Sequence, residues 1–335
     1  MDAMAPAFPR LLGDVGGTNA RWAWQPGPGA PLEHVRVLGC SNFDAIDGCI
    51  AHYLRSEGLS PPRAAAFGIA TAVLGDSVAM TNHAWRFSIT ALQRALGVER
   101  LLVLNDFEAL ALALPALGPG DVQQLGGGTA VAGANLAVLG AGTGLGVAGL
   151  VANGQGGWNA VVGEGGHASL AATNAREDAL LTVLRERFGH VSAERVLSGP
   201  GLLNLYAAVC TVNGVDPQPL EPADVLARGL GEGGPHCPRC VEALACFAAF
   251  LGSVAGNLAL TLGARGGIYL GGGIAPRLGR HLERLPFRAR FEDKGRFRAY
   301  LAAIPSWIVT APAPALLGAA VALDRHAAPA VHQLS

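Results

Sequence analysis

A run of small residues near the start of the chain, GDVGGTNAR at positions 13–21, has the composition of a phosphate-binding site. Adjacent glycines leave backbone N–H groups open to an anion and permit backbone angles that other residues avoid. The run also supplies the hydroxyl of Thr18 and the carboxylate of Asp14, which could hold Mg²⁺ directly or through water. A plain hairpin turn uses the same residue types, so that alternative stays open. The run is not a P-loop, because it lacks the G-x-x-x-x-G-K-[ST] pattern.

A second glycine-rich run, GAGTGLG at positions 140–146, lies between two apolar segments. A dinucleotide-binding turn has a different glycine spacing and leads directly into a helix, which the sequence does not indicate here. Two turns of this kind, one from each half of the chain, could hold a triphosphate from opposite sides. The pair is therefore a more specific indication of a nucleotide than either run alone.

The carboxylate of Asp106 follows a strongly apolar segment, RLLVLN at positions 100–105. Ligands of open α/β sheets bind at the carboxyl ends of such buried strands. Asp106 could take the proton of an attacking hydroxyl group, as phosphoryl transfer to an alcohol requires. The alternative is that Asp106 is only the N-cap of the apolar helix expected after it, and taken alone these residues favour the cap.

Further polar side chains could grip a polyol. Glu164 and His167 lie in the loop GEGGH at positions 163–167, and Glu194 lies in VSAERVLSGPG, near the expected start of a short helix. A structural histidine and a carboxylate placed at a helix N-terminus are the plainer interpretations. Together with Asn105 and Asp106, however, these residues offer the carboxylates, amide and imidazole that sugar hydroxyls require.

The segment His236-Cys237-Pro-Arg-Cys240 resembles part of a zinc site. A structural zinc ion needs four ligands, and neither a second C-x-x-C nor an H-x₃₋₅-H follows at a suitable spacing. A redox role is expected even less, because no thioredoxin-like strand precedes the pair. We expect two thiols at the start of a helix, and no zinc.

The composition is that of a globular cytoplasmic protein that acts on small molecules. The chain has 335 residues, 50% of them hydrophobic and 15% charged, with a net charge of −1, which argues against nucleic acid and anionic membranes as partners. Six cysteines in a chain of this length do not suggest a disulfide framework, and nothing at the N-terminus looks like a signal peptide. Residues 243–264 are uncharged and long enough to span a bilayer, but we expect them to form a buried core helix.

The elements that must position these residues follow from hydrophobic periodicity. The first part indicates strands and helices in alternation, with Ser41 as the N-cap of a helix that carries Phe43, Ile46, Ile50 and Leu54 on one face. The pattern then restarts near residue 135 with a strand, a glycine turn and a second strand. A helix is expected at 174–188, with Asn174 as N-cap, Glu177 in a capping box and Gly189 at its end. We expect strands at 10–17, 21–25, 32–39, 64–70, 77–82, 100–106, 135–154, 158–166 and 266–274, and helices at 88–97, 108–117, several positions between 190 and 264, and 314–323.

Each half of the chain thus opens with a strand, a glycine-rich turn and a strand. The Pro/Gly-rich segment near 115–128 is the most obvious boundary. We expect a small α/β domain over 1–115, completed by a C-terminal helix at about 312–330, and a large α/β domain over 116–311. The halves share little sequence, so any duplication would be one of architecture.

These motifs occur together in the order typical of one family. The chain resembles the bacterial glucokinases, in the proteobacterial-type branch of the actin-like ATPase superfamily. The resemblance extends over nearly the whole chain, and its segments lie at 13–21, 78–85, 105–109, 140–148, 163–167, 189–206, 256–277, 287–297 and 314–318.

The resemblance implies an actin-like (ribonuclease H-like) α/β fold with two domains around a cleft. It implies a cytoplasmic transferase, a kinase that converts D-glucose and ATP, with Mg²⁺, into glucose 6-phosphate in the first step of glycolysis. It suggests a homodimer. Glucose would be held by Asn105, Asp106, Glu164, His167 and Glu194, with Asp106 as the catalytic base. The residues implied to face ATP are Gly13, Asp14, Gly16, Gly17, Thr18, Gly142, Thr143, Gly144, Gly272 and Gly273.

Two positions depart from the family pattern: Ala72 replaces a usual proline, and Ala315 a common glycine. The related ROK kinases and repressors carry cysteines shortly after their Gly-His, whereas HASLAATNARED follows here, which places the chain outside that group. A kinase for another hexose or amino sugar remains an alternative, since pocket details select the sugar. A sugar-responsive regulator is remote, because about ten residues precede the first expected strand and the charge does not suit DNA.

Overall fold

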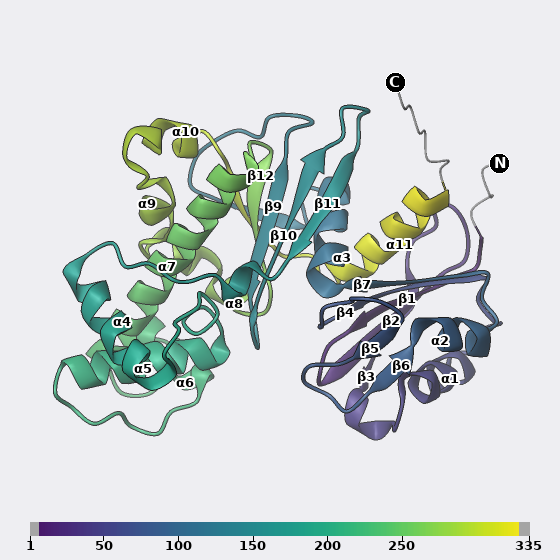
Figure 1. Cartoon of the computed structure of the whole chain (residues 1–335), viewed down its shortest axis with the longest axis horizontal. Helices are drawn as coiled ribbons and strands as arrows, with labels where there is room; N and C mark the ends of the chain where they lie inside the picture. The colour runs from purple at the N-terminus through teal and green to yellow at the C-terminus, as the bar shows by residue number, and fades with distance from the viewer. Residues whose placement is uncertain (1–6, 328–335) are drawn as a thin grey trace. The chain divides into compact units, whose positions relative to one another are not determined.

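The computed structural model describes residues 7–327, and its internal contacts divide the chain into two units. Unit 1 contains the described residues up to Leu117 together with those from Ala311 onward. Unit 2 runs from Gly118 to Thr310. Figure 1 shows the elements of each unit.

Unit 1 is built on a five-stranded mixed sheet with the order β3-β2-β1-β4-β7. Its strands are β1 (Arg10–Val15), β2 (Asn19–Gln25), β3 (Glu33–Gly39), β4 (Ala64–Ile69) and β7 (Arg100–Asn105). The first three are antiparallel neighbours, whereas β4 pairs in parallel with both β1 and β7. The carboxyl ends of β1, β4 and β7 therefore meet at one edge of the sheet. A separate hairpin joins β5 (Ser77–Ala79) to β6 (Arg86–Ser88).

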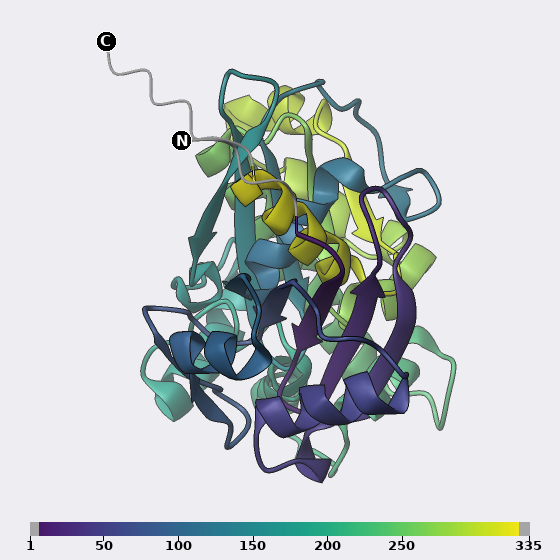
Figure 2. The same cartoon turned by 90° about the vertical axis from the view of Figure 1, so that its right-hand side faces the viewer.

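Helices cover both faces of this sheet, as Figure 2 shows. On one face, α1 (Ile46–Ser56) and α2 (Ile89–Leu96) pack against side chains such as Leu11 and Phe67. On the other, α11 (Pro314–Ala327) packs on Leu12 and Ala66 and lies against α3 (Asp106–Ala113). Apolar side chains thus point to both faces of β1 and β4, as expected for strands covered on both sides.

Unit 2 is built on a six-stranded mixed sheet with the order β11-β10-β9-β12-β13-β8. Its strands are β8 (Val122–Leu125), β9 (Leu136–Ala141), β10 (Leu145–Ala152), β11 (Trp158–Gly163), β12 (Gly267–Gly271) and β13 (Ser306–Val309). Three antiparallel strands, β11, β10 and β9, are followed by β12 and β13 in parallel. This repeats the arrangement of β3-β2-β1-β4-β7, so the two units share a topology.

The helices of unit 2 form one large core with its sheet. They are α4 (Ala175–Phe188), α5 (Gly199–Val212), α6 (Pro222–Leu230), α7 (Pro238–Leu262), α8 (Ile274–Leu278), α9 (Phe287–Glu292) and α10 (Arg298–Ala302). Among the described residues, α7 alone is long and apolar enough to cross a membrane, yet 67% of its most apolar window is buried inside the protein. Its packing against α5, α6 and α9 is that of a core helix.

Most expected elements are confirmed, but three local predictions are wrong. Helix α1 begins at Ile46 with Ala45 as its N-cap, because Ser41 lies in a separate 3₁₀ turn, Cys40–Asn42. Glu177 forms no capping box: its carboxylate accepts from the N–H of Thr173, one residue before the cap Asn174, at 2.8 Å. Glu194 lies in a turn ahead of α5, whose N-cap is Ser198.

Candidate functional site

The turn between β1 and β2 presents unused backbone donors. Gly16 donates to the Asn19 carbonyl at 2.9 Å, whereas the N–H groups of Gly17 and Thr18 make no hydrogen bond with the described residues. A Cβ on Gly17 would lie 2.8 Å from the Asn82 carbonyl oxygen, so only glycine fits beside that loop. Free N–H groups at the end of a strand are suited to bind an anion.

Asp14 lies on β1, two residues before this turn, and its carboxylate pairs with Arg21 on β2 at 2.9 Å. Burial raises the pKa of the Asp14 carboxyl above its ordinary value, and the charge and hydrogen bond of Arg21 offset this only in part. A half-buried carboxylate beside this turn is a suitable oxygen ligand for Mg²⁺, and a cation there would favour its ionised form.

Asn105 and Asp106 lie at the same edge of the sheet, where β7 leads into α3. Asn105 is the N-cap of α3, since its Oδ1 accepts from the N–H groups of Phe107 at 2.9 Å and Glu108 at 3.3 Å. Its Nδ2 donates to the Thr71 carbonyl at 3.3 Å. Asp106 is the first residue of the helix, and its Oδ1 also accepts from Phe107 N–H at 2.9 Å. The cap expected of Asp106 is therefore provided by Asn105.

The start of α3 lies beside the strand that leads into the β1–β2 turn. A methyl group on Gly68 of β4 would stand 3.5 Å from the Asp106 Cα and 3.9 Å from the Gly13 carbonyl oxygen. Unit 1 thus brings Gly13, Asp14, the glycine turn and the pair Asn105-Asp106 together at one sheet edge.

The corresponding turn of unit 2, between β9 and β10, has the same character. Gly142 donates to the Gly144 carbonyl at 2.8 Å, while the N–H groups of Thr143 and Gly144 make no hydrogen bond within the described part of the chain. A Cβ on Gly140 would lie 2.6 Å from the Gly271 carbonyl carbon, so the end of β9 that leads into this turn lies backbone to backbone against the end of β12. Gly272, which follows β12, has φ +73°, a left-handed conformation that favours glycine.

Glu194 is tied to this turn from 49 residues away. Its Oε2 accepts from the Leu145 N–H at 2.9 Å, and its own N–H donates to the Gly166 carbonyl at 2.8 Å. His167 donates its N–H to the Glu164 carbonyl at 3.0 Å, which closes the 3₁₀ turn Gly165–His167. Unit 2 thus brings Glu164, His167 and Glu194 next to the β9–β10 turn.

Sequence reasoning missed one contributor, the N-terminus of α5. Gly199 donates its N–H to the Gly142 carbonyl at 2.8 Å, and Ser198 caps the helix by accepting from Gly201 N–H at 2.9 Å. The signal was present as S-G-P-G, a cap followed by a proline in the first turn. Its contact with Gly142 could not be read from the sequence, because the two segments lie far apart in it.

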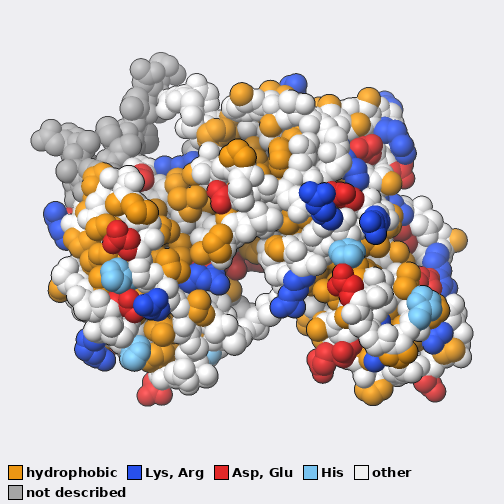
Figure 3. All heavy atoms as spheres, turned by 180° about the vertical axis from the view of Figure 1, so that it is seen from behind, with side chains coloured by type: hydrophobic (Ala, Val, Ile, Leu, Met, Phe, Trp, Pro, Cys, Tyr) orange, Lys and Arg blue, Asp and Glu red, His pale blue; other side chains and the backbone are white. Residues whose placement is uncertain are grey.

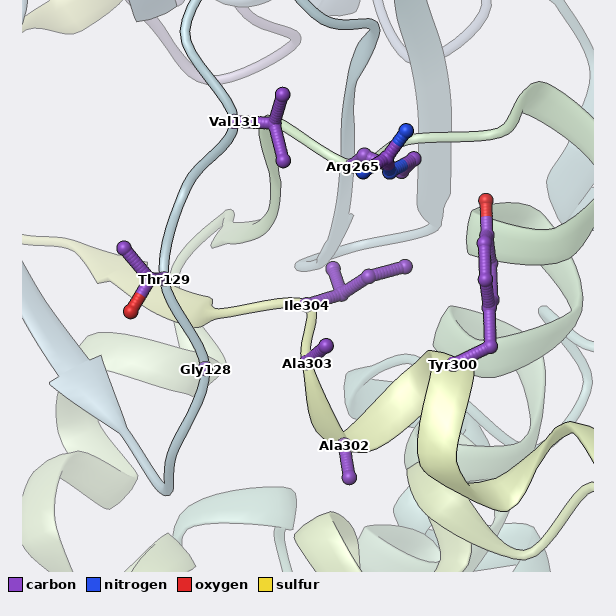
Figure 4. A pocket seen from close by; sticks show the side chains of 8 residues that line it. All are labelled: Gly128, Thr129, Val131, Arg265, Tyr300, Ala302, Ala303 and Ile304. Atoms are coloured by element: carbon purple, nitrogen blue, oxygen red, sulfur yellow. The ribbon is translucent and has the colours of Figure 1, made fainter.

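Unit 2 also contains a cavity of about 710 Å³ that none of the predicted residues lines. Figure 4 shows its wall, where Arg265 and the Tyr300 hydroxyl lie on one side and Thr129 on the other. The residues that line it are Gly128, Thr129, Val131, Arg265, Tyr300, Ala302, Ala303 and Ile304. None of these described residues carries a carboxylate or imidazole, so the cavity offers no general base of the kind that phosphoryl transfer needs.

Neither the surface charge nor the potential metal ligands add evidence for a site at these two sheet edges. On the face drawn in Figure 3, acidic and basic side chains are interspersed, in keeping with the net charge of −1. Within residues 7–327, no group of three or more His, Cys, Asp or Glu side chains is arranged to hold a metal ion. Cys237 and Cys240 lie at the start of α7, as expected.

Comparisons with known proteins agree with the sequence motifs. The family model described as glucokinase matches residues 11–326. The glucokinase of Aromatoleum aromaticum is 53% identical over 318 residues, which cover 95% of each chain. Among solved structures, the glucokinase from an Antarctic psychrotroph is 36% identical, with a TM-score of 0.85 over 95% of this chain and 99% of its own.

More distant structures share the fold alone. The ROK hexokinase from Thermus thermophilus is 17% identical, with a TM-score of 0.66 over 94% of this chain and 98% of its own. ROK proteins are therefore distant structural neighbours, as the missing cysteine motif predicts, and the expected actin-like α/β fold is confirmed. With a family model that covers nearly the whole chain and a relative that shares half of its residues, the chain belongs to the glucokinase family.

Proposed function

We propose that Asp106 is the general base in the ATP-dependent phosphorylation of the 6-hydroxyl of D-glucose, which gives glucose 6-phosphate at the start of glycolysis. The chain is a glucokinase by family, and its relatives carry that name over nearly their whole length. The assignment of individual residues rests on the two sheet edges described above.

The observation that supports the proposal is that Asn105, and not its neighbour Asp106, is the N-cap of α3. Asn105 caps α3 through its side chain, so the helix does not require Asp106 as its cap. Asp106 lies in the first turn, at the carboxyl end of a buried parallel strand, where α/β sheets place their ligands. A carboxylate at such a place, beside a helix whose N-cap is another residue, is a candidate for proton transfer.

The nucleotide would be held by the two glycine turns. The unused N–H groups of Gly17, Thr18, Thr143 and Gly144 can donate to phosphate oxygens, and the turn at 271–273 would lie near the adenosine. Asp14 would hold Mg²⁺ directly or through water. When bound, Mg²⁺ supplies positive charge that neutralises the phosphate oxygens during transfer.

Glucose would be bound by the remaining polar residues. Glu164, His167 and Glu194 can accept from or donate to its hydroxyls. Asn105 can contribute through the second N–H of its Nδ2, since its Oδ1 already accepts two bonds. Because Glu194 is held by the Leu145 N–H, its carboxylate is oriented before the sugar arrives.

The chemistry then needs one proton transfer. As the 6-hydroxyl oxygen attacks the γ-phosphorus, its proton passes to the Asp106 carboxylate, and the bond from phosphorus to the β-phosphate oxygen breaks. The backbone N–H groups stabilise the charge on the phosphate oxygens. Both substrates are cytoplasmic metabolites, so we place the enzyme in the cytoplasm; the homodimer suggested by the resemblance stays a prediction.

The decisive experiment is Asp106→Asn, measured by glucose-6-phosphate formation and by glucose binding. Asn keeps the shape and hydrogen bonding but cannot take a proton, so kcat should fall at least about 10²-fold while the protein folds and still binds glucose weakly. Glu108→Gln, which removes the next carboxylate along the same helix, should retain kcat within about threefold, since only a positioned base gives the larger factor. Near-normal turnover in Asp106→Asn would show that another group is the base.

A further inference from the structure

The side-chain amide of Asn105 is held by hydrogen bonds at both its oxygen and its nitrogen. Its Oδ1 accepts from two N–H groups of α3, and its Nδ2 donates to the carbonyl of Thr71 at 3.3 Å. A primary amide is planar and carries two N–H donors, so these bonds leave one N–H over, in a fixed direction. The Thr71 carbonyl therefore sets the direction of the remaining donor of Asn105.

Thr71 lies where the chain leaves the sheet of unit 1. The N–H of Ala70, just beyond β4, donates to the Val15 carbonyl at 3.0 Å. The N–H of Thr71 turns back to the Ile69 carbonyl at 2.7 Å. The loop that follows contains no proline before β5, and its Leu74 is 94% exposed. Because neither a proline ring nor the packing of Leu74 restrains this loop, the carbonyl at its start needs another restraint.

The side chain of Thr71 supplies such a restraint. Its Oγ1 donates to the Ala79 carbonyl at 3.1 Å and lies 3.1 Å from the Oγ1 of Thr81. A threonine hydroxyl has one proton and two lone pairs, so Thr71 donates to Ala79 and accepts from Thr81. Both bonds cross the loop, because they join the residue after the end of β4 to the carboxyl end of β5.

The segment that receives these bonds is anchored. Ala79 ends β5, which pairs with β6. The N–H of Met80 donates to the Trp85 carbonyl at 3.1 Å. The Trp85 side chain is 1% exposed and donates its Nε1 to the Phe43 carbonyl at 3.0 Å. The hydroxyl of Thr71 is thus tied to a hairpin that packs in the core of unit 1.

We propose that the Thr71 hydroxyl is a positioning group for glucose: it fixes the Thr71 carbonyl, which orients the Asn105 amide toward a sugar hydroxyl. The inference rests on the proposed function, in which the second N–H of Asn105 donates to glucose. Thr71 touches no reacting atom, so its loss should weaken sugar binding and leave the chemical step unchanged. An interaction that is equally strong in the ground state and the transition state affects KM and not kcat.

The test is Thr71→Val, which keeps the shape of the side chain and removes its hydroxyl. Both bonds of the hydroxyl lie at the surface, so the variant should fold, and its melting temperature checks this. KM for glucose should rise about 3- to 10-fold, the factor that one hydrogen bond represents in an equilibrium constant. In the same steady-state measurements, kcat and KM for ATP should stay within about twofold.

Two variants control for the position and the loss of a hydroxyl. Thr71→Ser keeps the hydroxyl and should have a glucose KM close to that of the unaltered protein. Thr211→Val removes an exposed hydroxyl on α5 that bonds the Ala207 carbonyl of its own helix, and should change no kinetic constant. The positioning role is overturned if Thr71→Val changes kcat or KM for ATP as much as KM for glucose, or if Thr71→Ser has the same glucose KM as Thr71→Val.

Asn105→Ser distinguishes a failure of this inference from a failure of the proposed function. Serine keeps a capping oxygen for α3 and removes the amide, so KM for glucose should rise. Adding Thr71→Val to this variant should cause no further rise, because both changes act on the same interaction. An unchanged glucose KM in Asn105→Ser would overturn the glucose ligands of the proposed function and this inference with them. A rise in Asn105→Ser but not in Thr71→Val, or a further full rise in the double variant, would overturn the positioning role alone.

Discussion

The Asp14 carboxylate and the Arg21 guanidinium form an ion pair across the ladder of β1 and β2, with 2.9 Å between Oδ2 and Nη1. Burial nevertheless raises the pKa of Asp14 above that of the unfolded chain. Ionisation of Asp14 therefore reduces stability, and this penalty grows as pH rises from 3.8 through the folded pKa. A residue that weakens the fold at neutral pH is a candidate for a functional role.

Asp14→Asn should separate the effect of this carboxylate on stability from its proposed role in binding Mg²⁺. At pH 7 we expect an unchanged or higher melting temperature, and a difference from the unaltered protein that vanishes below about pH 4, where Asp14 is protonated. The Mg²⁺ concentration for half-maximal activity should rise about 10-fold or more, as for other residues that support a bound metal. Asp47→Asn, an exposed carboxylate on α1, should change neither quantity. An unaltered Mg²⁺ requirement in Asp14→Asn would remove Asp14 from the metal site.

Gly144→Ala should act on glucose through Glu194. A Cβ at this position would lie 2.5 Å from the Glu194 Oε2, so the carboxylate must leave the Leu145 N–H. Loss of a hydrogen bond to a charged group corresponds to about 1.5–3 kcal/mol, and we expect KM for glucose to rise at least about 10-fold. Gly142→Ala meets only the Gly273 nitrogen at 4.0 Å, and should affect ATP more than glucose. Steady-state kinetics in both substrates decide this, and equal glucose KM values in the two variants would contradict it.

Gly318→Ala should destabilise unit 1. Its Cβ would lie 1.6 Å from the Ala109 carbonyl oxygen, where α11 crosses α3, and the helices would have to separate. Forcing a side chain into such a contact costs about 1–3 kcal/mol or more. Gly48→Ala on α1 makes the same change where a Cβ meets nothing within 4 Å, and should be neutral or stabilising by up to about 1 kcal/mol. Chemical denaturation of both variants compares them, and equal stabilities would show that the crossing can relax.

Glu177→Gln should lower the free energy of unfolding at neutral pH but not at acidic pH. The Glu177 side chain is 4% exposed and pairs with Arg290 at 2.8 Å. Burial would raise its pKa, but the hydrogen bonds and charge of Arg290 and the bonds from Thr173 outweigh this and lower the pKa below 4.5. The pair therefore stabilises the fold above pH 4.5, and this contribution is lost as pH falls through the folded pKa.

At pH 7 the free energy of unfolding of Glu177→Gln should be lower by about 1.5–3 kcal/mol, the range for hydrogen bonds to a charged group. The difference in the free energy of unfolding between this variant and the unaltered protein should become smaller below pH 4.5, as measured by denaturation at several pH values. Glu242→Gln breaks a half-exposed pair with Arg176 and should cost less than about 1 kcal/mol at any pH. A gap for Glu177→Gln that is independent of pH would assign its effect to packing.

The sequence by itself determined most elements of the fold, because hydrophobic periodicity and turn residues act over a few positions. The buried strand at Ala64–Ile69, the short helix α2 at Ile89–Leu96 and the end of α4 at Gly189 all follow from such local patterns. The family, too, was legible from motifs such as GDVGGTNAR and GEGGH in their order. Local patterns failed at the start of α1, where Ser41 offers a capping side chain but the helix begins after Ala45, whose side chain makes no cap hydrogen bond.

Only the tertiary structure decided which groups serve each site residue. The tertiary structure makes Asn105 the cap beside Asp106, holds Glu194 on the Leu145 N–H, and places the Gly199 N–H on the Gly142 carbonyl. These contacts join segments that are distant in the sequence or that compete locally. The partner of Glu177 changed for the same reason, since Arg290 lies 113 residues away. The packing of the whole unit selects such hydrogen bonds, because every buried polar group must find a partner within it. No short sequence window contains both partners of such a bond.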